Sequence, residues 1–307
     1  MTPRLELAIY HYGSGTVPAE QGHIRLVQPF TDQLDVVSEA LFGLETGGRA
    51  EHPGEVLLRS VYDLKWREGP GVVKVVYVAG NEDFGQGPVD PAAAIDRARD
   101  RGIAVNTVYC GGAQQGIAHG WKAGAQRSGG RYLGIDANHV MIYVPAPQDD
   151  EIARLGQRLD ETYVPYGLHG RAGLDNLHRQ NDNARESGRG AQIERVLAKA
   201  TALFRNHVWD LVDAMNTGHV AVHEVDRATL PPSLRQLEPS ALVALVDARA
   251  QARTRIQDRL LALGRSREAW LALHAPDAAG PRLGLHNAIA GSLREQLVRA
   301  GFMLPQA

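Results

Sequence analysis

Residues 72–112 constrain the fold of this chain more than any other stretch. Residues 72–79 (Val-Val-Lys-Val-Val-Tyr-Val-Ala) are almost continuously apolar and rich in β-branched side chains, which is typical of a strand buried on both faces. Asp90, followed by proline, predicts the start of a helix, and Gly102 predicts its end. Residues 103–109 form a second apolar run. Because the connection is so short, the pattern predicts two parallel strands joined by a right-handed helical crossover.

The composition limits what the chain can bind. It has 307 residues, with 33 Lys and Arg against 35 Asp and Glu and a net charge of −2, so no positive excess favours nucleic acid or an anionic membrane. Cys110 is the single cysteine, which excludes an internal disulfide framework and a Cys-rich metal module. No apolar run reaches the roughly 20 residues of a membrane helix, and the first residues lack a signal-peptide pattern. As written, we expect a cytoplasmic protein; export would require a start further upstream.

The flanking segments extend the same alternation of strands and helices. Before the central stretch, the pattern predicts a strand, an edge strand and two amphipathic helices, at residues 5–10, 23–27, 31–44 and 53–64. After it, the pattern predicts a glycine-interrupted helix and two strands, at residues 111–128, 131–135 and 139–144.

Residues 145–147 (Pro-Ala-Pro) mark a change in composition. Beyond them the sequence shows no convincing strand. It predicts helices at residues 148–163, 192–205, 240–263 and 286–300, with a long polar loop or irregular helix at 168–190 and a strand-like alternation at 219–224. We therefore expect an α/β domain at residues 1–146 and an α-helical region at residues 147–307.

The order of these segments resembles a von Willebrand factor type A (vWA) domain. Residues 78–89 (Val-Ala-Gly-Asn-Glu through Gln-Gly-Pro-Val) are similar to one bacterial subgroup, and residues 209–214 (Trp-Asp-Leu-Val-Asp-Ala) are similar to the helical tail of that subgroup. The resemblance implies a three-layer, Rossmann-type fold with a mainly parallel sheet. It also implies a non-catalytic protein-interaction module. Its loops at residues 46–52, 80–87 and 111–115 would bind a protein partner at the carboxyl ends of the strands.

The chain departs from the family at its amino terminus. vWA domains open with a central strand carrying Asp-x-Ser-x-Ser, and only four residues precede Leu5 here. In the family's topology that strand separates residues 5–10 from residues 72–79. Its absence leaves two strand edges open to association with other chains. Either these two strands pair directly, or the native protein begins further upstream; we favour the second interpretation.

The same resemblance implies a degenerate metal-ion-dependent adhesion site. The family's second and third metal loops correspond to the regions of Glu51 and of Asn81 and Glu82, whose oxygen atoms suit Mg²⁺ or Ca²⁺. Without the first loop, however, too few protein oxygens converge for a tight site. We therefore expect a degenerate or absent metal site, no required cofactor and no catalytic residues.

Two other functions remain open from the sequence. Gly111 to Gly116 approximates the fingerprint Gly-x-Gly-x-x-Gly, and Asp136 follows 20 residues after Gly116, as a ribose-binding acid would in a dinucleotide-dependent enzyme. Short turns and close packing explain these glycines equally well. Cys110 and His119 could form a nucleophile pair, although a buried cysteine usually serves packing. The third possibility is a structural scaffold that acts through the helical region.

Overall fold

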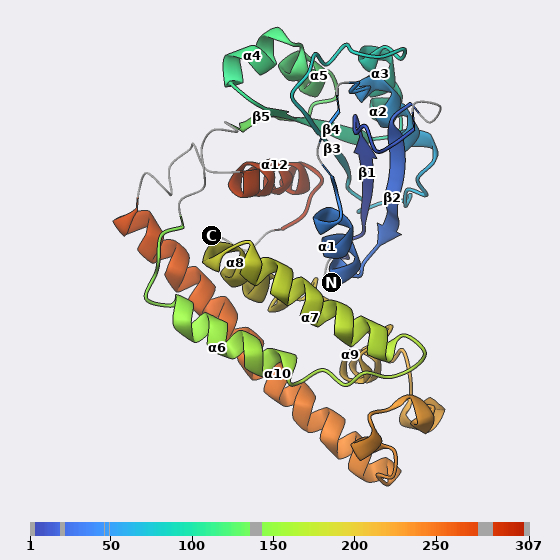
Figure 1. Cartoon of the computed structure of the whole chain (residues 1–307), viewed down its shortest axis with the longest axis vertical. Helices are drawn as coiled ribbons and strands as arrows, with labels where there is room; N and C mark the ends of the chain where they lie inside the picture. The colour runs from blue at the N-terminus through green and yellow to red at the C-terminus, as the bar shows by residue number, and fades with distance from the viewer. Residues whose placement is uncertain are drawn as a thin grey trace. The chain divides into compact units, whose positions relative to one another are not determined.

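The structure is a computed structural model that describes residues 4–18, 22–45, 47–48, 50–135, 143–275 and 285–303 (Figure 1). By its internal contacts the chain forms two compact units. The sheet unit consists of Ala8–Phe30, Leu44–Ile142 and Gly280–Ala307, and the helical unit of Met1–Leu7, Thr31–Gly43 and Tyr143–Ala279. The expected domains at residues 1–146 and 147–307 stay a prediction, because compactness alone does not establish independent folding.

A three-stranded parallel sheet forms the centre of the sheet unit. Its strands, in spatial order, are β3 (Lys74–Gly80), β4 (Ile103–Cys110) and β5 (Tyr132–Ile135). The register pairs Lys74 with Ile103 and Gly80 with Tyr109, so the carboxyl ends of β3 and β4 lie together. The predicted parallel crossover is confirmed.

The helix of this crossover is α3 (Pro91–Asp100). The carboxylate of Asp90 accepts a hydrogen bond of 2.9 Å from the backbone N–H of Ala92, which satisfies one of the free amides of the first turn. Gly102 has φ +68°, a left-handed conformation that glycine adopts without strain. Both ends of the helix therefore lie where the local sequence predicts them.

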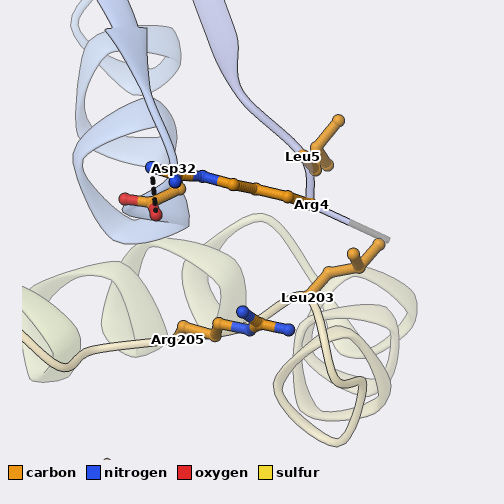
Figure 2. Close-up of a pocket in the computed structure, with 5 residues that line it drawn as sticks. All are labelled: Arg4, Leu5, Asp32, Leu203 and Arg205. Atoms are coloured by element: carbon orange, nitrogen blue, oxygen red, sulfur yellow. Dashed lines mark ion pairs between the residues drawn. The ribbon is translucent and has the colours of Figure 1, made fainter. Parts of the chain in front are cut away.

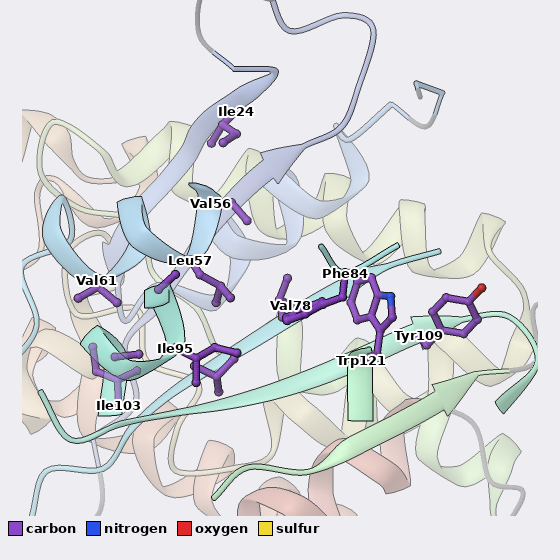
Figure 3. Close-up of a cluster of buried hydrophobic side chains, with 13 residues drawn as sticks. Ile24, Val56, Leu57, Val61, Val78, Phe84, Ile95, Ile103, Tyr109 and Trp121 are labelled. Carbon is purple, nitrogen blue, oxygen red and sulfur yellow. The ribbon is translucent and has the colours of Figure 1, made fainter. Parts of the chain in front are cut away.

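Helices cover both faces of this sheet. One face packs against α2 (Pro53–Tyr62), α3 and α5 (Trp121–Arg127). A short helix, α4 (Ala113–Ala118), precedes α5 in the chain. This cluster (Figure 3) comprises Ile24, Val56, Leu57, Val61, Val78, Phe84, Ala94, Ile95, Ala98, Ile103, Val105, Tyr109 and Trp121. Successive strand residues point to opposite faces, and Asn106 on the other face bonds to Gln296 of α12 (Leu285–Arg299). The expected α/β class, a parallel sheet between helices, is confirmed.

Two further strands form a separate sheet. β1 (Leu7–Tyr12) pairs with β2 (Ile24–Thr31), and no ladder joins β1 to β3 within the part of the chain that the structure describes. The first alternative from the sequence, direct pairing of residues 5–10 with residues 72–79, is therefore not found among the described residues. β2 continues past Pro29 to Thr31; proline is tolerated in an edge strand because one side of its backbone has no partner. The strand expected at 139–144 lies mostly outside the described residues.

The helical unit is built from helices that bury both apolar and polar side chains. Its helices are α1 (Leu34–Phe42), α6 (Asp149–Asp160), α7 (Gly170–Glu186), α8 (Arg189–Lys199), α9 (Leu211–Asn216) and α10 (Pro239–His274), with short 3₁₀ turns at Val222–Glu224, Arg227–Thr229 and Pro232–Leu234. The helical character expected after residue 147 is confirmed. No helix in the described ranges has the length and apolarity to cross a membrane.

Two local expectations for this unit were wrong. The polar stretch at 168–190 contains the regular helix α7, whose Gln180 is 1% exposed. Its polar side chains have partners inside the unit: Asn181 donates 2.9 Å to Asp160 and accepts 3.1 Å from Lys199. The alternation at 219–224 ends in a 3₁₀ turn that begins at Val222 rather than in a strand.

Candidate functional site

Three loops meet at the carboxyl ends of β1 and β3, and together they form the candidate site. The backbone N–H of Gly15, after β1, donates 2.8 Å to the carbonyl oxygen of Gly47 in the loop before α2. The hydroxyl of Tyr12, the last residue of β1, donates 2.5 Å to the carbonyl oxygen of Ala79 in β3. These contacts hold the loops that follow β1, precede α2 and follow β3 against one another.

Glu51 lies at the centre of this arrangement. Its Oε2 atom accepts hydrogen bonds of 3.3 and 3.4 Å from the backbone N–H groups of Asn81 and Glu82. Its own backbone N–H donates 2.6 Å to Oε1 of Gln86. One residue of the loop before α2 is thus bound to both ends of the loop after β3.

Two glycines permit this close approach. A Cβ atom on Gly80 would lie 2.3 Å from Oε2 of Glu51, and one on Gly48 would lie 1.7 Å from the carbonyl oxygen of Gly13. Both distances are far below van der Waals contact, so a larger residue at either position forces the loops apart. The sequence does not reveal this role, because the atoms concerned belong to different loops.

A pair of aromatic side chains anchors the loop after β3 to the core. Phe84 is 4% exposed, and its ring centroid lies 4.9 Å from that of the fully buried Trp121. The indole N–H of Trp121 donates 2.8 Å to the carbonyl oxygen of Glu82. In the same loop, Asn81 and Asp83 are exposed. The loop therefore has a fixed base and a polar rim open to solvent.

Burial disfavours the charged forms of Glu51 and Cys110. Burial raises the pKa of the Glu51 carboxyl; the backbone N–H groups of Glu82 and Asn81 oppose this, and the charge of Glu82 adds to it. Burial, followed by the charge of Glu51, raises the pKa of the Cys110 thiol. A raised pKa keeps this thiol protonated at neutral pH, which is unfavourable for a nucleophile. The ring of His119 stands edge-on to Tyr109, with centroids 5.9 Å apart.

The three expected metal ligands do not form a complete cation shell. The structure brings the carboxylate of Glu51 to the backbone amides of Asn81 and Glu82, which are hydrogen-bond donors and repel a cation. Among the residues described, no three His, Cys, Asp or Glu side chains are grouped so as to hold a metal. Mg²⁺ requires about six oxygen ligands in octahedral geometry. Water supplies several of these ligands in many Mg²⁺ sites, so a metal site at Glu51, Asn81 and Glu82 stays a prediction.

The glycines of residues 111–116 make room for side chains of the chain itself. A Cβ atom on Gly116 would lie 2.3 Å from the hydroxyl of Tyr132 and 2.5 Å from the ring of Tyr109, and one on Gly111 would lie 2.7 Å from the same ring. The hydroxyl of Tyr132 also donates 2.8 Å to the carbonyl oxygen of Ala113. Packing thus accounts for two of the glycines. Asp136 lies outside the described residues, and dinucleotide binding stays a prediction.

The helical unit contains a small pocket (Figure 2), lined by Arg4, Leu5, Asp32, Leu203 and Arg205. A guanidinium nitrogen of Arg4 lies 3.4 Å from a carboxylate oxygen of Asp32. The cavity volume is about 10 Å³, which is room for about one water molecule. This pocket is too small for an organic substrate.

Comparison with known proteins gives no match: no family model, no curated protein and no solved structure matches this chain. The resemblance to vWA domains and the function that it implies therefore stay predictions from the residues themselves.

Proposed function

We propose that the sheet unit is a non-catalytic protein-interaction module resembling a vWA domain. In this proposal it binds a protein partner through the loops at residues 46–52, 80–87 and 111–115. The observation that carries the proposal is the double attachment of Glu51 to Asn81 and Glu82, with Tyr12 bonded to Ala79 beside it. Loops held in one shape by a sheet are the usual place for recognition in open α/β folds.

The exposure of the loops supports binding to a macromolecule. Asn81, Asp83 and residues 112–115 are exposed, whereas Phe84 and Trp121 below them are buried. A rigid base limits the entropy that the loops lose on binding, since few side chains need to be ordered. No cavity of substrate size is needed for such a surface.

The electrostatics of the site favour binding without a metal. The carboxylate of Glu51 already accepts two backbone amides, and burial raises its pKa. Both features lower its tendency to coordinate a cation as a free carboxylate. The partner would then be recognised by hydrogen bonds and charge at the polar rim of the loops.

A site-specific photo-crosslink tests the proposal. A photoreactive amino acid replaces Asn81 in one variant and, as a matched control, the exposed Asp182 of α7 in the other. In cells that express each variant, we expect a protein adduct of discrete mass from position 81 alone. Equal adducts from both positions, or no adduct from position 81, would refute binding by these loops.

A further inference from the structure

A pair of histidine rings joins the two ends of α9 in the helical unit. His207 precedes this helix and His219 follows it, and their ring centroids lie 4.5 Å apart with the ring planes at 62°. His207 is half-buried, and its carbonyl oxygen accepts 2.7 Å from the hydroxyl of Tyr166, whereas His219 is exposed. The proposed binding loops contain neither histidine, so the pair is a separate feature of the molecule.

The pair lies where the chain turns away from α9. The backbone N–H of His219 donates 2.8 Å to the carbonyl oxygen of Ala214 in the helix, and Gly218 before it has φ +68°. This turn brings the ring of His219 to that of His207. Val220, the next residue, packs against a buried apolar cluster of the helical unit. The contact between the two rings therefore helps to keep an apolar side chain covered.

The surroundings of His207 offer little compensation for a positive charge. The charged groups that face its ring, apart from His219, are the carboxylates of Asp32 and Asp213 and the guanidinium of Arg4. Asp32 is already paired with Arg4, at 3.4 Å (Figure 2), and Asp213 is paired with Arg253. Both acids therefore have a cationic partner before His207 gains a proton.

Protonation of His207 is linked to stability. Burial lowers the pKa of His207 below its ordinary value of 6.5; the charge of Asp32 opposes this, and a charge on His219 adds to it. The unfolded chain thus binds this proton more tightly than the folded chain. The stability that neutral His207 contributes is therefore complete above pH 6.5 and is lost as the pH falls towards the folded pKa.

We propose that the His207–His219 pair is a pH-sensitive switch that releases residues 217–222, the segment after α9, in mild acid. With uncharged rings the pair packs edge to face. When both rings carry a proton, two positive charges lie 4.5 Å apart and repel each other. His219 is exposed and moves into water, and Val220 leaves the apolar cluster with it.

Amide hydrogen exchange of the full chain, followed by NMR, tests the switch. Protection compares each amide with the same unfolded sequence at the same pH, and it reports local opening. Between pH 8 and pH 5, we expect protection of the Gly218 and His219 amides to fall at least fivefold. Protection of residues 152–159 in α6 should change less than twofold. No fall at Gly218 and His219, or an equal fall in α6, would overturn the switch.

A matched pair of variants tests the role of charge. His219→Gln keeps a polar side chain but removes one of the two charges, so the fall in Gly218 protection should be less than twofold. His223→Gln is the control, because His223 is exposed and outside the pair; it should retain the fall of the wild type. A full fall in His219→Gln, or its loss in His223→Gln, would overturn the proposal.

The titration of the His207 ring gives a readout that simple packing of His219 would not produce. A charge on His219 lowers the pKa of His207. The pKa of His207, read from its ring chemical shifts, should therefore rise in His219→Gln, with proton affinity at least twofold higher, and stay unchanged in His223→Gln. An unchanged or lower pKa of His207 in His219→Gln would overturn the electrostatic basis of the switch.

Discussion

Tyr12 and Ala79, at the carboxyl ends of β1 and β3, are joined by a hydrogen bond of 2.5 Å from the Tyr12 hydroxyl to the Ala79 carbonyl oxygen. The bond connects the two sheets at the edge where the candidate loops begin. It also occupies a backbone acceptor that a neighbouring strand would otherwise use. Within the described residues, β1 and β3 are therefore joined by a side chain rather than by a β-ladder.

Removal of the Tyr12 hydroxyl should weaken the attachment of β1 to β3. Tyr12→Phe keeps the ring packed against the core but leaves the Ala79 carbonyl without its donor. We expect a loss of about 1 kcal/mol in the free energy of unfolding, measured by urea denaturation. The control is Tyr62→Phe, because Tyr62 is 57% exposed; its effect should stay within about 0.5 kcal/mol. Equal effects of the two variants would contradict a role for the bond.

The attachment of α12 to the sheet should depend on a buried amide pair. Nε2 of Gln296 donates 2.8 Å to Oδ1 of Asn106, and Nδ2 of Asn106 lies 3.3 Å from Oε1 of Gln296. Gln296→Ala leaves Nδ2 of the buried Asn106 without its acceptor, while Oδ1 keeps the backbone N–H of Arg131; this should cost about 1–3 kcal/mol of stability. Glu295→Ala on the same helix removes exposed ion pairs with Arg131 and Arg299 and should cost at most about 1 kcal/mol. A larger loss from Glu295→Ala in chemical denaturation would contradict this assignment.

A buried ion cluster should make the helical unit sensitive to pH once its cation is removed. Arg253 lies 2.6 Å from Asp210, which is 0% exposed, and also contacts Asp213. These carboxylates raise the pKa of Arg253 and keep it charged. Arg253→Met leaves the buried carboxylates uncompensated and should cost about 3–5 kcal/mol at pH 7.

The sign of the pH dependence follows from Asp210. Burial raises its pKa above the ordinary value of 3.8, and Arg253 opposes this rise. In Arg253→Met the pKa rises further, so the folded state binds a proton more tightly than the unfolded state. Stability of the variant then falls as pH increases above 3.8 towards the folded pKa. The free energy of unfolding is measured by urea denaturation at pH 5 and pH 8. The loss in Arg253→Met relative to the wild type should be larger at pH 8, and equal losses at the two pH values would contradict the argument.

Divalent cations should leave the stability of the chain unchanged. The carboxylate of Glu51 already accepts two backbone N–H groups, so we expect this site to offer a cation little binding free energy. Thermal melts with EDTA, Mg²⁺, Ca²⁺ or Mn²⁺ should agree within about 1 °C, since a ligand stabilises a fold only when it binds it. A rise of several degrees with one cation, lost in Glu51→Ala or Asn81→Ala, would instead establish a metal site.

Local signals allowed the crossover and its flanking strands to be predicted. The apolar runs at 72–79 and 103–109, with a cap at Asp90 and a stop at Gly102, depend on neighbouring residues alone. Residues 168–190 were harder, because their polarity matches a loop. The partners that make this stretch a buried helix, such as Asp160 and Lys199, come from other helices. Composition does not record such distant pairing.

The candidate site was predictable in part. The resemblance to a family drew attention to Glu51, Asn81 and Glu82 as metal ligands, and in the structure the carboxylate of Glu51 lies against the backbone of the other two. The resemblance did not point to Tyr12 or Gln86. The bond from Tyr12 spans 67 positions and that to Gln86 spans 35, and neither follows a helical or strand period. Only the fold brings these side chains to the loops.

The most direct test of a metal-free binding surface is the affinity of the partner captured at position 81. Its Kd is measured by calorimetry for the wild type, for Gly80→Ala and for Gly291→Ala, whose added Cβ meets no atom within 4 Å. We predict the same Kd in EDTA and in Mg²⁺, and a Kd raised at least tenfold in Gly80→Ala, or about 1.4 kcal/mol, but unchanged in Gly291→Ala. Loss of binding in EDTA, or an unchanged Kd in Gly80→Ala, would contradict the account.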